Sequence, residues 1–583
     1  MNLSSTIKSI QDIMRKDDGV DGDAQRIGQL TWMLFLKIFD QREEEWEDDS
    51  PTYKSPLPKR FRWRNWAAYT TDAAGKRKPQ MAPNELISFV NNELFPALSE
   101  QIDPGRSPQH RVIKQVFEDS HNYMKSGPLM LGVIEKLEEV INFHDFKTRA
   151  QLGDVYEQIL NDLRAAGNAG EFYTPRAITQ FMVAQANPRL AKRETVLDPA
   201  CGTGGFLTAT IDNFRRQLST KASAKDKRAI EELIRGIEKK QLPHLLCTTN
   251  MLLHGIDVPS QITRENTLSK GWNDWTRSDR VDCVITNPPF GGFEEDTVGG
   301  TFPPDLRTRE TADMFIALIV KKLLKDHGRA AVVLPDGFLF GEGIKGKLKE
   351  LLLRECNLHT IIRLPKGVFA PYTSIKTNLL FFTKGEPTEM IWFYEHPYPP
   401  GYKSYSKTKP IRLEEFKLEQ EWWGNEANDF IDREENELAW KVNFKAKREQ
   451  AESAAQPHWH RAEELSNKAS ALDDKVREQK SRMNGSTDDA RRKDITAAIE
   501  QLHLESETLR QQARDAQAAG DRLYWPIYNL DIKNPNTPEA ESHDPDVLLE
   551  KYKNVLGEVE ETQNQLKGAL AAALASHFAS RGL

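Results

Sequence analysis

The segment VDCVITNPPFGG, residues 281–292, decides how the rest of the chain is interpreted. Val281 to Thr286 is a short apolar run bounded by turn residues, which is typical of a buried strand. Two prolines follow Asn287, and because proline cannot donate to a sheet ladder, strand pairing must stop there. The segment therefore predicts either an abrupt exit from a sheet or a pocket made of hydrogen-bond acceptors and the flat ring of Phe290.

The composition is that of a soluble protein with a large core, since 38% of the 583 residues are hydrophobic and 29% are charged. The chain holds no apolar run near the roughly 20 residues that a membrane helix needs, and its first residues lack the apolar centre of a secretory signal. The four cysteines are far apart, with no CxxC pair. This spacing favours a reducing cytoplasm and argues against a zinc site or a disulfide framework, so we expect no metal and no membrane.

The charge balance restricts how nucleic acid could be bound. Lys and Arg number 80 against 87 Asp and Glu, which gives a formal net charge of -7 and a pI near 6.1. A protein that grips DNA alone usually presents an excess of cationic side chains to the phosphates. One possibility is that nucleic acid is not the substrate. The other is that a local basic face or a partner chain supplies part of the attraction for the phosphates.

Composition and periodicity divide the chain into four regions. Residues 1–145 look helical, and the segment 30–47 is so rich in apolar residues that it belongs in a helical core. In residues 146–445 short apolar strands alternate with amphipathic stretches, which predicts an α/β domain with a doubly wound sheet. Residues 446–523 have the composition of a helical hairpin arm, and residues 524–583 form a tail that ends in a long helix.

Apolar seams define the arm and the tail. In the arm the apolar residues step by three and four on both sides of Asn484-Gly485-Ser486, which predicts two antiparallel helices with a structural role. The seam consists of Ala462, Leu465, Ala469, Leu472 and Val476, then Ile495, Ile499, Leu502 and Leu509. The tail helix, from about Asp546, has the seam Leu549, Tyr552, Leu556, Val559, Leu566 and Leu570. A solitary seamed helix needs a surface to pack against, which is either its own globular domain or a partner subunit.

Upstream of the opening segment, the stretch ETVLDPACGTGGFL, residues 194–207, joins a strand to a glycine loop. The strand runs into Asp198 and then a loop that contains Gly202, Thr203, Gly204 and Gly205. Glycines let a backbone approach a ligand closely, and the following helix points its N-terminus at the loop. The next strand ends in Glu238, and an acidic residue at that position of a doubly wound fold can accept hydrogen bonds from both ribose hydroxyls of a cofactor.

The combination of DPACGTGGF and NPPF resembles the amino-methyltransferases that use S-adenosylmethionine. More closely, the chain resembles the modification subunit of type I restriction–modification systems. The further motifs that carry this resemblance are GEFYTPR (170–176), NMLLHGI (250–256), ENTL (265–268), TADMFI (311–316) and NLDIKNP (529–535). They run over most of the chain, although the helical arm has no counterpart among them.

The resemblance implies a fold, an activity and partners. The fold is a doubly wound S-adenosylmethionine-dependent methyltransferase fold with an N-terminal helical domain and a C-terminal helical hairpin or coiled-coil region. The activity is transfer of a methyl group from S-adenosylmethionine to the N6 amine of adenine in a specific duplex DNA site. The implied partners are double-stranded DNA and a specificity subunit that reads the sequence, with a second copy of this chain and a restriction or motor subunit in the full complex.

The family's catalytic motif has a physical explanation in NPPF. An adenine N6 amine is a poor nucleophile because its lone pair is delocalised into the ring, and acceptors placed on its two hydrogens localise that pair. The side-chain oxygen of Asn287 and the carbonyl of Pro288 suit this role, because a residue before proline is held extended. Pro289 stiffens the loop, and Phe290 offers a ring on which a base turned out of the duplex can stack. The pocket interpretation is therefore favoured.

The resemblance also assigns the cofactor contacts. The segment at the methionine end of the cofactor would be Glu171, Phe172, Tyr173, Thr174, Pro175 and Arg176, with Tyr173 and Thr174 the nearest. Asp198 and the loop through Gly205 would border the methionine portion, and Glu238 the ribose. Asn266 lies where such enzymes often place an Asp or Asn near the cofactor adenine.

Three alternatives remain open from sequence alone. Glutamine methyltransferases that act on proteins also use an NPP-aromatic motif, but they are smaller and would not need the arm, the tail or GEFYTPR. N4-cytosine methylation is a closer alternative, although its enzymes usually begin the motif with Ser rather than with the Asn found here. A catalytically silent scaffold would not need intact motif residues, and calorimetry with S-adenosylmethionine separates it from an enzyme.

Overall fold

The computed structural model describes residues 3–71, 75–141, 156, 173–219, 223–370, 372–406, 408–484, 489–536 and 545–579. The chain forms two compact units, Met1–Asn534 and Pro535–Leu583. The predicted site residues Glu171 and Phe172 lie outside the described residues. Within the described part of the chain, no helix is long and apolar enough to cross a membrane.

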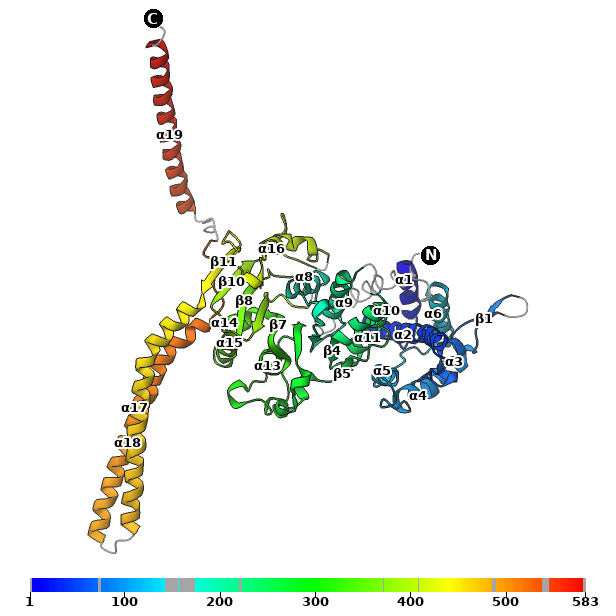
Figure 1. The fold of residues 1–583 in the computed structure, drawn as a ribbon, viewed down its shortest axis with the longest axis horizontal. Coiled ribbons are helices and arrows are strands. Elements are labelled where there is room, and N and C mark those ends of the chain that lie inside the picture. The colour runs from blue at the N-terminus through cyan, green and yellow to red at the C-terminus, as the bar shows by residue number, and fades with distance from the viewer. Residues whose placement is uncertain are drawn as a thin grey trace. The chain divides into compact units, whose positions relative to one another are not determined.

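The N-terminal region is built of helices (Figure 1, blue), and aromatic side chains such as Trp32, Phe35 and Phe39 belong to its core. Its helices are α1 (Leu3–Met14), α2 (Gly22–Asp49), α3 (Pro83–Phe89), α4 (Phe95–Glu100), α5 (Pro108–Phe117) and α6 (Gly127–Val140), and a short pair of strands comprises β1 (Thr70–Thr71) and β2 (Arg77–Lys78). Every residue from Ile27 to Asp40 of α2 is buried, which confirms the predicted core helix. The same core includes Leu245, Leu246 and Leu252 of α11 (Gln241–Leu253), so the helical region is packed onto the next one.

A nine-stranded sheet forms the centre of the next region, in the order β11-β10-β8-β9-β7-β6-β3-β4-β5. The strands are β3 (Val196–Asp198), β4 (Ile234–Glu238), β5 (Ile262–Arg264), β6 (Val281–Thr286), β7 (Leu324–Pro335), β8 (Cys356–Arg363), β9 (Thr377–Lys384), β10 (Met390–Glu395) and β11 (Ala439–Asn443). β5, β4, β3, β6 and β7 run parallel, β8 and β10 pair in parallel, and β9 and β11 are antiparallel to their neighbours. The predicted doubly wound α/β fold is confirmed.

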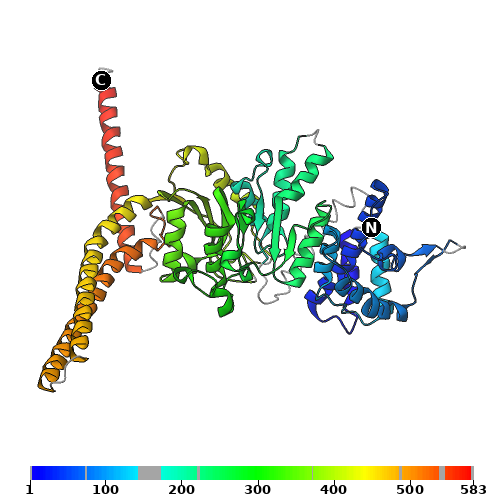
Figure 2. The same cartoon turned by 60° about the horizontal axis from the view of Figure 1, so that its bottom comes forward.

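Helices cover both faces of this sheet (Figure 2). They are α8 (Arg176–Ala186), α9 (Gly205–Gln217), α10 (Ala224–Leu233), α11, α13 (Thr311–Leu318) and α15 (Ile344–Glu355), and the short helices are α12 (Asp296–Gly299), α14 (Asp336–Phe340) and α16 (Lys417–Trp422). In β6, Val284 belongs to the core shared with α13 and α15, whereas Cys283 and Ile285 belong to the core shared with α8 and α9. Because both faces are buried, the strand is a continuous apolar run in the sequence.

The chain order reverses between β3 and β6, which are neighbours in the sheet. From β3 the chain continues to β4 and β5 on one side, and from β6 it continues to β7 on the other. Ligands of doubly wound folds bind outside the carboxyl ends of the strands at such a switch point. The glycine loop follows β3 and NPPF follows β6, so the fold brings the two motifs together there.

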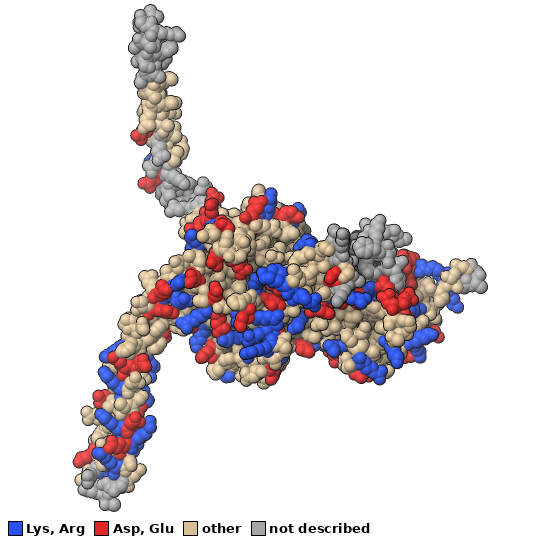
Figure 3. Space-filling view, in the orientation of Figure 1, with Lys and Arg blue, Asp and Glu red and all other residues tan. Residues whose placement is uncertain are grey.

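The arm is an antiparallel pair of long helices, α17 (Phe444–Asn484) and α18 (Asp489–Tyr524). Trp459 Nε1 donates to Asp521 Oδ1 at 2.9 Å, and Ser506 Oγ donates to Asp473 Oδ1 at 2.8 Å, so the two helices pair along their length. The predicted seam residues Ala462, Leu465, Ala469 and Val476 are buried. The predicted hairpin is confirmed, and charges of both signs are interspersed along it (Figure 3).

The second unit contains one described helix, α19 (Pro545–Ala579), which confirms the long C-terminal helix. Its predicted seam is exposed, including Leu549, Tyr552, Leu556, Val559, Leu566 and Leu570. The surface that covers this seam stays a prediction.

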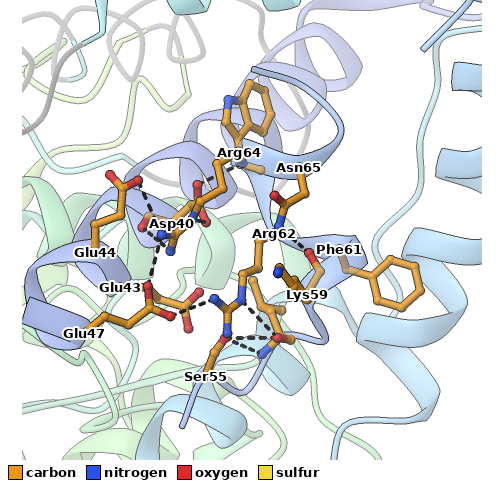
Figure 4. Close-up of polar contacts among 12 residues, drawn as sticks. Asp40, Glu43, Glu44, Glu47, Ser55, Lys59, Phe61, Arg62, Arg64 and Asn65 are labelled. Atoms are coloured by element: carbon orange, nitrogen blue, oxygen red, sulfur yellow. Dashed lines mark hydrogen bonds and ion pairs between the residues drawn. The ribbon is translucent and has the colours of Figure 1, made fainter. Parts of the chain in front are cut away.

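Helix α2 also buries a polar cluster (Figure 4). Asp40 accepts hydrogen bonds from the backbone N–H and the Nε of Arg64, both at 2.9 Å. Glu43 accepts one from the Tyr53 hydroxyl at 2.9 Å, and its second oxygen has no hydrogen-bond donor among the described residues. Burial raises the pKa of Glu43 to about 7, although nearby hydroxyl groups lower it. This carboxyl group can therefore hold a proton near neutral pH.

Candidate active site

A cavity of about 190 Å³ lies at the switch point of the sheet. Its wall includes Asp198 at the end of β3, Glu238 at the end of β4, Asn266 after β5 and Asn287 after β6. These four predicted residues come together because the carboxyl ends of parallel strands meet at one edge of a sheet. A cavity with convergent polar groups at this position is the expected ligand site of the fold.

The glycine loop forms one wall of the cavity. Gly204 has a φ of +83°, and a Cβ atom built there would lie 2.8 Å from the Sγ of Cys247, so only glycine fits. α9 begins at the next residue, Gly205, and its N-terminal end faces the loop. Thr203 lines the cavity with its neighbours Gly202 and Gly205, and its carbonyl accepts a hydrogen bond from Asn250 Nδ2 at 3.1 Å. The predicted loop therefore approaches the cavity with its backbone.

Glu238 fixes the glycine loop from the neighbouring strand. One carboxylate oxygen accepts the backbone N–H of Gly202 at 3.0 Å, and the other accepts that of Lys240 at 2.7 Å. The carbonyl of Ile237 accepts the N–H of Cys201 at 3.0 Å. Each carboxylate oxygen can accept more than one hydrogen bond, so Glu238 holds the loop and still presents acceptors to a ligand.

Asp198 connects the two halves of the sheet. Its Oδ1 accepts a hydrogen bond from the hydroxyl of Thr286 at 2.7 Å and one from the backbone N–H of Ala200 at 3.2 Å. Thr286 ends β6 and Asp198 ends β3, so this contact spans the switch point. The side chain is 1% exposed, and burial raises its pKa to about 7, against the lowering effect of these two hydrogen bonds.

Asn287 lines the cavity and carries a buried acceptor atom. Its Nδ2 donates to the hydroxyl oxygen of Thr174 at 2.9 Å, which fixes the orientation of the amide. Its Oδ1 is buried and has no hydrogen-bond donor in the part of the chain that the structure describes. Because Asn287 lines the cavity, this oxygen is available to a donor group of a ligand.

The other residues of NPPF are divided between the cavity and the core. Pro289 lines the cavity, and Pro288 is buried. Phe290 is 9% exposed and packs edge-on against Phe369, with ring centroids 6.3 Å apart. Its ring does not line the cavity in this conformation, so the proposed stacking of a base on Phe290 stays a prediction.

The described residues of GEFYTPR lie at the same site. Tyr173 and Thr174 line the cavity, and Pro175 precedes the first residue of α8. Arg176 is exposed and lines a small adjacent cleft rather than the cavity itself. The segment thus reaches the cavity with its first two described residues, and its contact with the cofactor stays a prediction.

Asn266 lines the cavity, but its side chain is engaged with the protein. Its Oδ1 accepts the N–H of Leu268 at 3.1 Å, and its Nδ2 donates to Glu294 at 3.2 Å. Glu294 also forms an ion pair with Lys239 at 3.1 Å. Asn266 therefore shapes the wall through a network with the segment that follows NPPF.

Sequence reasoning missed several residues of the wall. Lys239, Lys240 and Glu265 line the cavity directly after β4 and β5, so the argument from strand ends could have found them. Tyr372 and Glu294 reach the cavity from long loops, and neither periodicity nor a motif marks them. Among the described residues, no group of three or more His, Cys, Asp or Glu side chains could hold a metal ion.

Two family models match the chain. The model of the N-6 DNA methylase family matches residues 147–467, and that of the HsdM N-terminal domain matches residues 3–137. Together they cover both the helical region and the sheet with its cavity.

Individual relatives and solved structures agree with these models. The type I restriction enzyme EcoEI methylase subunit of Escherichia coli is 49% identical over 578 residues, which are 99% of each chain. A modification subunit from Vibrio vulnificus YJ016 is 38% identical with a TM-score of 0.63, over 76% of this chain and 93% of that one. A chain from a structure on complex assembly of the type I R-M system is 30% identical with a TM-score of 0.67. This match covers 97% of this chain and 98% of that one. A match over 97% of this chain includes most of the helical arm.

Proposed function

Because this chain belongs to the family of type I restriction enzyme methylase subunits, we propose that its cavity transfers the methyl group of S-adenosylmethionine to the N6 amine of adenine in duplex DNA. The observation that carries the proposal is that Asn287 lines the cavity while its buried Oδ1 has no hydrogen-bond donor among the described residues. A buried acceptor left unpaired costs ~1–3 kcal/mol. An adenine amine that enters the cavity supplies the missing donor.

The chain's own groups would activate this amine by hydrogen bonding. Asn287 Oδ1 accepts one N–H of the adenine, and the carbonyl of Pro288 accepts the other, which localises the nitrogen lone pair. The cofactor supplies a methyl group that its cationic sulfur already activates. Catalysis then consists mainly of holding nitrogen, carbon and sulfur in line. The nitrogen–carbon bond forms as the carbon–sulfur bond breaks, and the nitrogen releases a proton to solvent.

Several cavity residues suit this cofactor in charge and hydrogen bonding. The glycine loop and the start of α9 would border the methionine portion together with Tyr173 and Thr174. Glu238 has acceptor positions for the ribose hydroxyls. The carboxyl group of Asp198 would lie near the methionine portion, where its ionised form attracts a cationic sulfur. Asn266 and its neighbour Glu265 would face the cofactor adenine.

We propose that duplex DNA and a specificity subunit are the partners, with a second copy of the chain and a restriction subunit in the full complex. The excess of acidic over basic residues gives no global attraction for phosphate, so a local basic face or a partner must supply part of the attraction for DNA. The exposed seam of α19 is a surface that such a partner can cover. We place the protein in the cytoplasm, since its four cysteines are far apart in the sequence with no CxxC pair, as is usual for a protein of a reducing compartment.

The glutamine and N4-cytosine alternatives are not favoured, because the family that matches the catalytic region is that of N-6 DNA methylases. The deciding experiment is to co-express the chain with its specificity subunit and sequence the DNA for modified bases. N6-methyladenine at one recurring sequence is the expected result. Methylated cytosine, or unmodified DNA from a complex that binds the cofactor, would contradict the proposal.

The role of α19 has its own test. Replacing Leu566 with Asp puts a charge into the seam, whereas Asn564→Asp adds the same charge beside it. Light scattering on the mixed chains should show that only Leu566→Asp weakens assembly with the specificity subunit, while both variants bind the cofactor. If Leu566→Asp assembles normally, the seam is not the partner surface.

A further inference from the structure

The segment directly after NPPF forms a loop that is closed at its base; we call residues 292–311 the flap. Phe293 and Glu310 form an antiparallel bridge. The N–H of Glu294 donates to the carbonyl of Arg309 at 3.0 Å, and that of Thr311 donates to the carbonyl of Gly292 at 3.0 Å. The two ends of the flap are therefore held together next to the cavity.

The base of the flap is also fixed from outside. Lys345 of α15 forms ion pairs with Glu310 at 2.5 Å and with Asp313 of α13 at 2.6 Å, and Asp313 is buried. The apolar anchor of the flap is Phe302, which is 3% exposed and packs 5.0 Å from the ring of Trp272. The flap is thus held in place without the ring of Phe293.

Adjacent flap residues point in different directions. Glu294 lines the cavity, where it contacts Lys239 and Asn266. Phe293, one residue earlier, is 70% exposed. Successive side chains of an extended segment point to opposite sides, so the ring of Phe293 leaves the flap on the side away from the cavity wall.

Two more exposed apolar side chains lie at the same edge of the sheet. Phe340 ends α14, which follows β7, and Ile375 precedes β9, which pairs antiparallel with β7. The end of β6, the end of β7 and the start of β9 are adjacent at this edge. One exposed apolar side chain is ordinary, but three in segments that adjoin the ends of neighbouring strands, at the edge that holds the cavity, favour contact with a partner there.

We infer that the ring of Phe293 enters the DNA duplex at the position that the target adenine leaves. This inference rests on the proposed function, because an adenine can reach Asn287 only after it has left the base stack. Its departure opens an apolar gap between the neighbouring base pairs, and proteins fill such gaps with apolar side chains. The fixed base of the flap holds Phe293 beside the cavity, and Phe340 and Ile375 contact the strand next to the gap.

The test compares two DNA substrates in the full complex with the specificity subunit. One is the matched duplex, and in the other the target adenine faces an abasic site, so that its base pair is already broken. Phe293→Ala should lower kcat/KM on the matched duplex by about 10- to 100-fold, the effect of losing one stacking contact. On the abasic substrate most of the activity should return. Phe293→Trp keeps an aromatic ring and should retain activity on both substrates.

Two controls separate this role from a structural one. Leu504→Ala removes an equally exposed side chain of α18 and should leave kcat/KM unchanged. With 2-aminopurine at the target position, the fluorescence increase on binding should be smaller for Phe293→Ala than for the unmodified chain. S-adenosylmethionine binding, measured by calorimetry, should be the same for both.

Three results would overturn the inference. Unchanged kcat/KM of Phe293→Ala on the matched duplex would show that the ring is an ordinary exposed side chain. An equal loss on both substrates would place Phe293 in the chemistry of the pocket. Failure of Phe293→Ala to assemble with the specificity subunit would assign these exposed apolar side chains to a protein partner. If the unmodified complex methylates neither substrate, the proposed function itself is wrong.

Discussion

The polar cluster on α2 and the cavity at the switch point each bury an oxygen atom that has no hydrogen-bond donor among the described residues. In the cluster the atom is Oε2 of Glu43, and in the cavity it is Oδ1 of Asn287. A carboxyl group can solve this problem itself by taking up a proton, and the pKa of Glu43 is raised to about 7. An amide oxygen cannot be protonated near neutral pH, and since no described residue donates to it, we expect a donor from a ligand.

The surroundings of the two oxygens differ as well, since one lies in a hydrogen-bonded cluster and the other belongs to a residue that lines a cavity. The residues around Glu43 bond to one another, as Asp40 and Arg64 do (Figure 4). Asn287 instead faces a cavity large enough for a ligand. A buried unpaired oxygen therefore indicates a binding site when it belongs to a group that cannot ionise and when its residue lines a cavity.

The largest expected effect tests the cavity side of this comparison. Asn287→Ala should lower kcat by about 100- to 1000-fold, comparable to the loss of a preorganised hydrogen-bonding group in other active sites. Cofactor affinity should change little, because Asn287 contacts the target base. Calorimetry and a tritium-transfer assay measure the two quantities. Asn287→Asp keeps an acceptor and should retain more activity than Asn287→Ala, and full activity of the alanine variant would refute the acceptor pocket.

The second-largest expected effect concerns protein stability and tests the polar cluster around Glu43. A folded-state pKa of about 7 for Glu43, above the ordinary 4.5, means that ionisation opposes folding, so this group's contribution to stability falls as pH rises from about 4.5 to 7. Glu43→Gln cannot ionise and should be more stable than the unmodified chain at pH 8, by up to about 3 kcal/mol, with the difference vanishing near pH 4.5. Calorimetric unfolding at several pH values checks this. A pH-independent difference would mean that Glu43 does not titrate in this range.

A smaller effect is expected at the loop that Glu238 holds. Glu238→Ala removes acceptors for the ribose and for the N–H groups of Gly202 and Lys240. It should weaken S-adenosylmethionine binding by ~1.5–3 kcal/mol, the usual value for a hydrogen bond to a charged group. Thr174→Val is the matched comparison, since it removes the partner of Asn287 and should reduce kcat more than cofactor affinity. Cofactor binding by Glu238→Ala equal to that of the unmodified chain would show that the strand-end assignment is wrong.

The sequence predicts the parts of this site that follow from strand topology. Asp198, Glu238 and Asn287 are at the carboxyl ends of strands, and parallel strands bring such ends to one edge. Family membership, predicted from the motifs around these residues, is confirmed. The helical arm and the long C-terminal helix were also predicted, because heptad seams are local patterns.

The parts that were missed depend on how distant loops pack. Neither a motif nor a period indicates that Thr174 fixes the amide of Asn287, that Phe369 covers Phe290 or that Tyr372 lines the cavity. The same applies to the seam of α19, whose pattern specifies a helix but not the surface that it contacts. Contacts between segments far apart in sequence require the folded structure.

The smallest expected effect concerns Asp198, which combines features of both regions. Like Glu43 it is a buried carboxyl group with a pKa raised to about 7, and like Asn287 it borders the cavity. Its ionised form should attract the cationic sulfur of S-adenosylmethionine, so bound cofactor should lower its pKa and release a proton. Affinity should then rise about tenfold between pH 6 and pH 8, because protonation competes with binding only below the pKa of the free protein. Calorimetry should find this dependence weaker for S-adenosylhomocysteine, which lacks the positive charge, and weaker for Asp198→Asn. The same pH profile for both ligands would show that Asp198 has only a structural role, namely to connect β3 and β6 by its hydrogen bond with Thr286. Its role would then resemble that of Glu43, which forms a hydrogen bond within its own cluster.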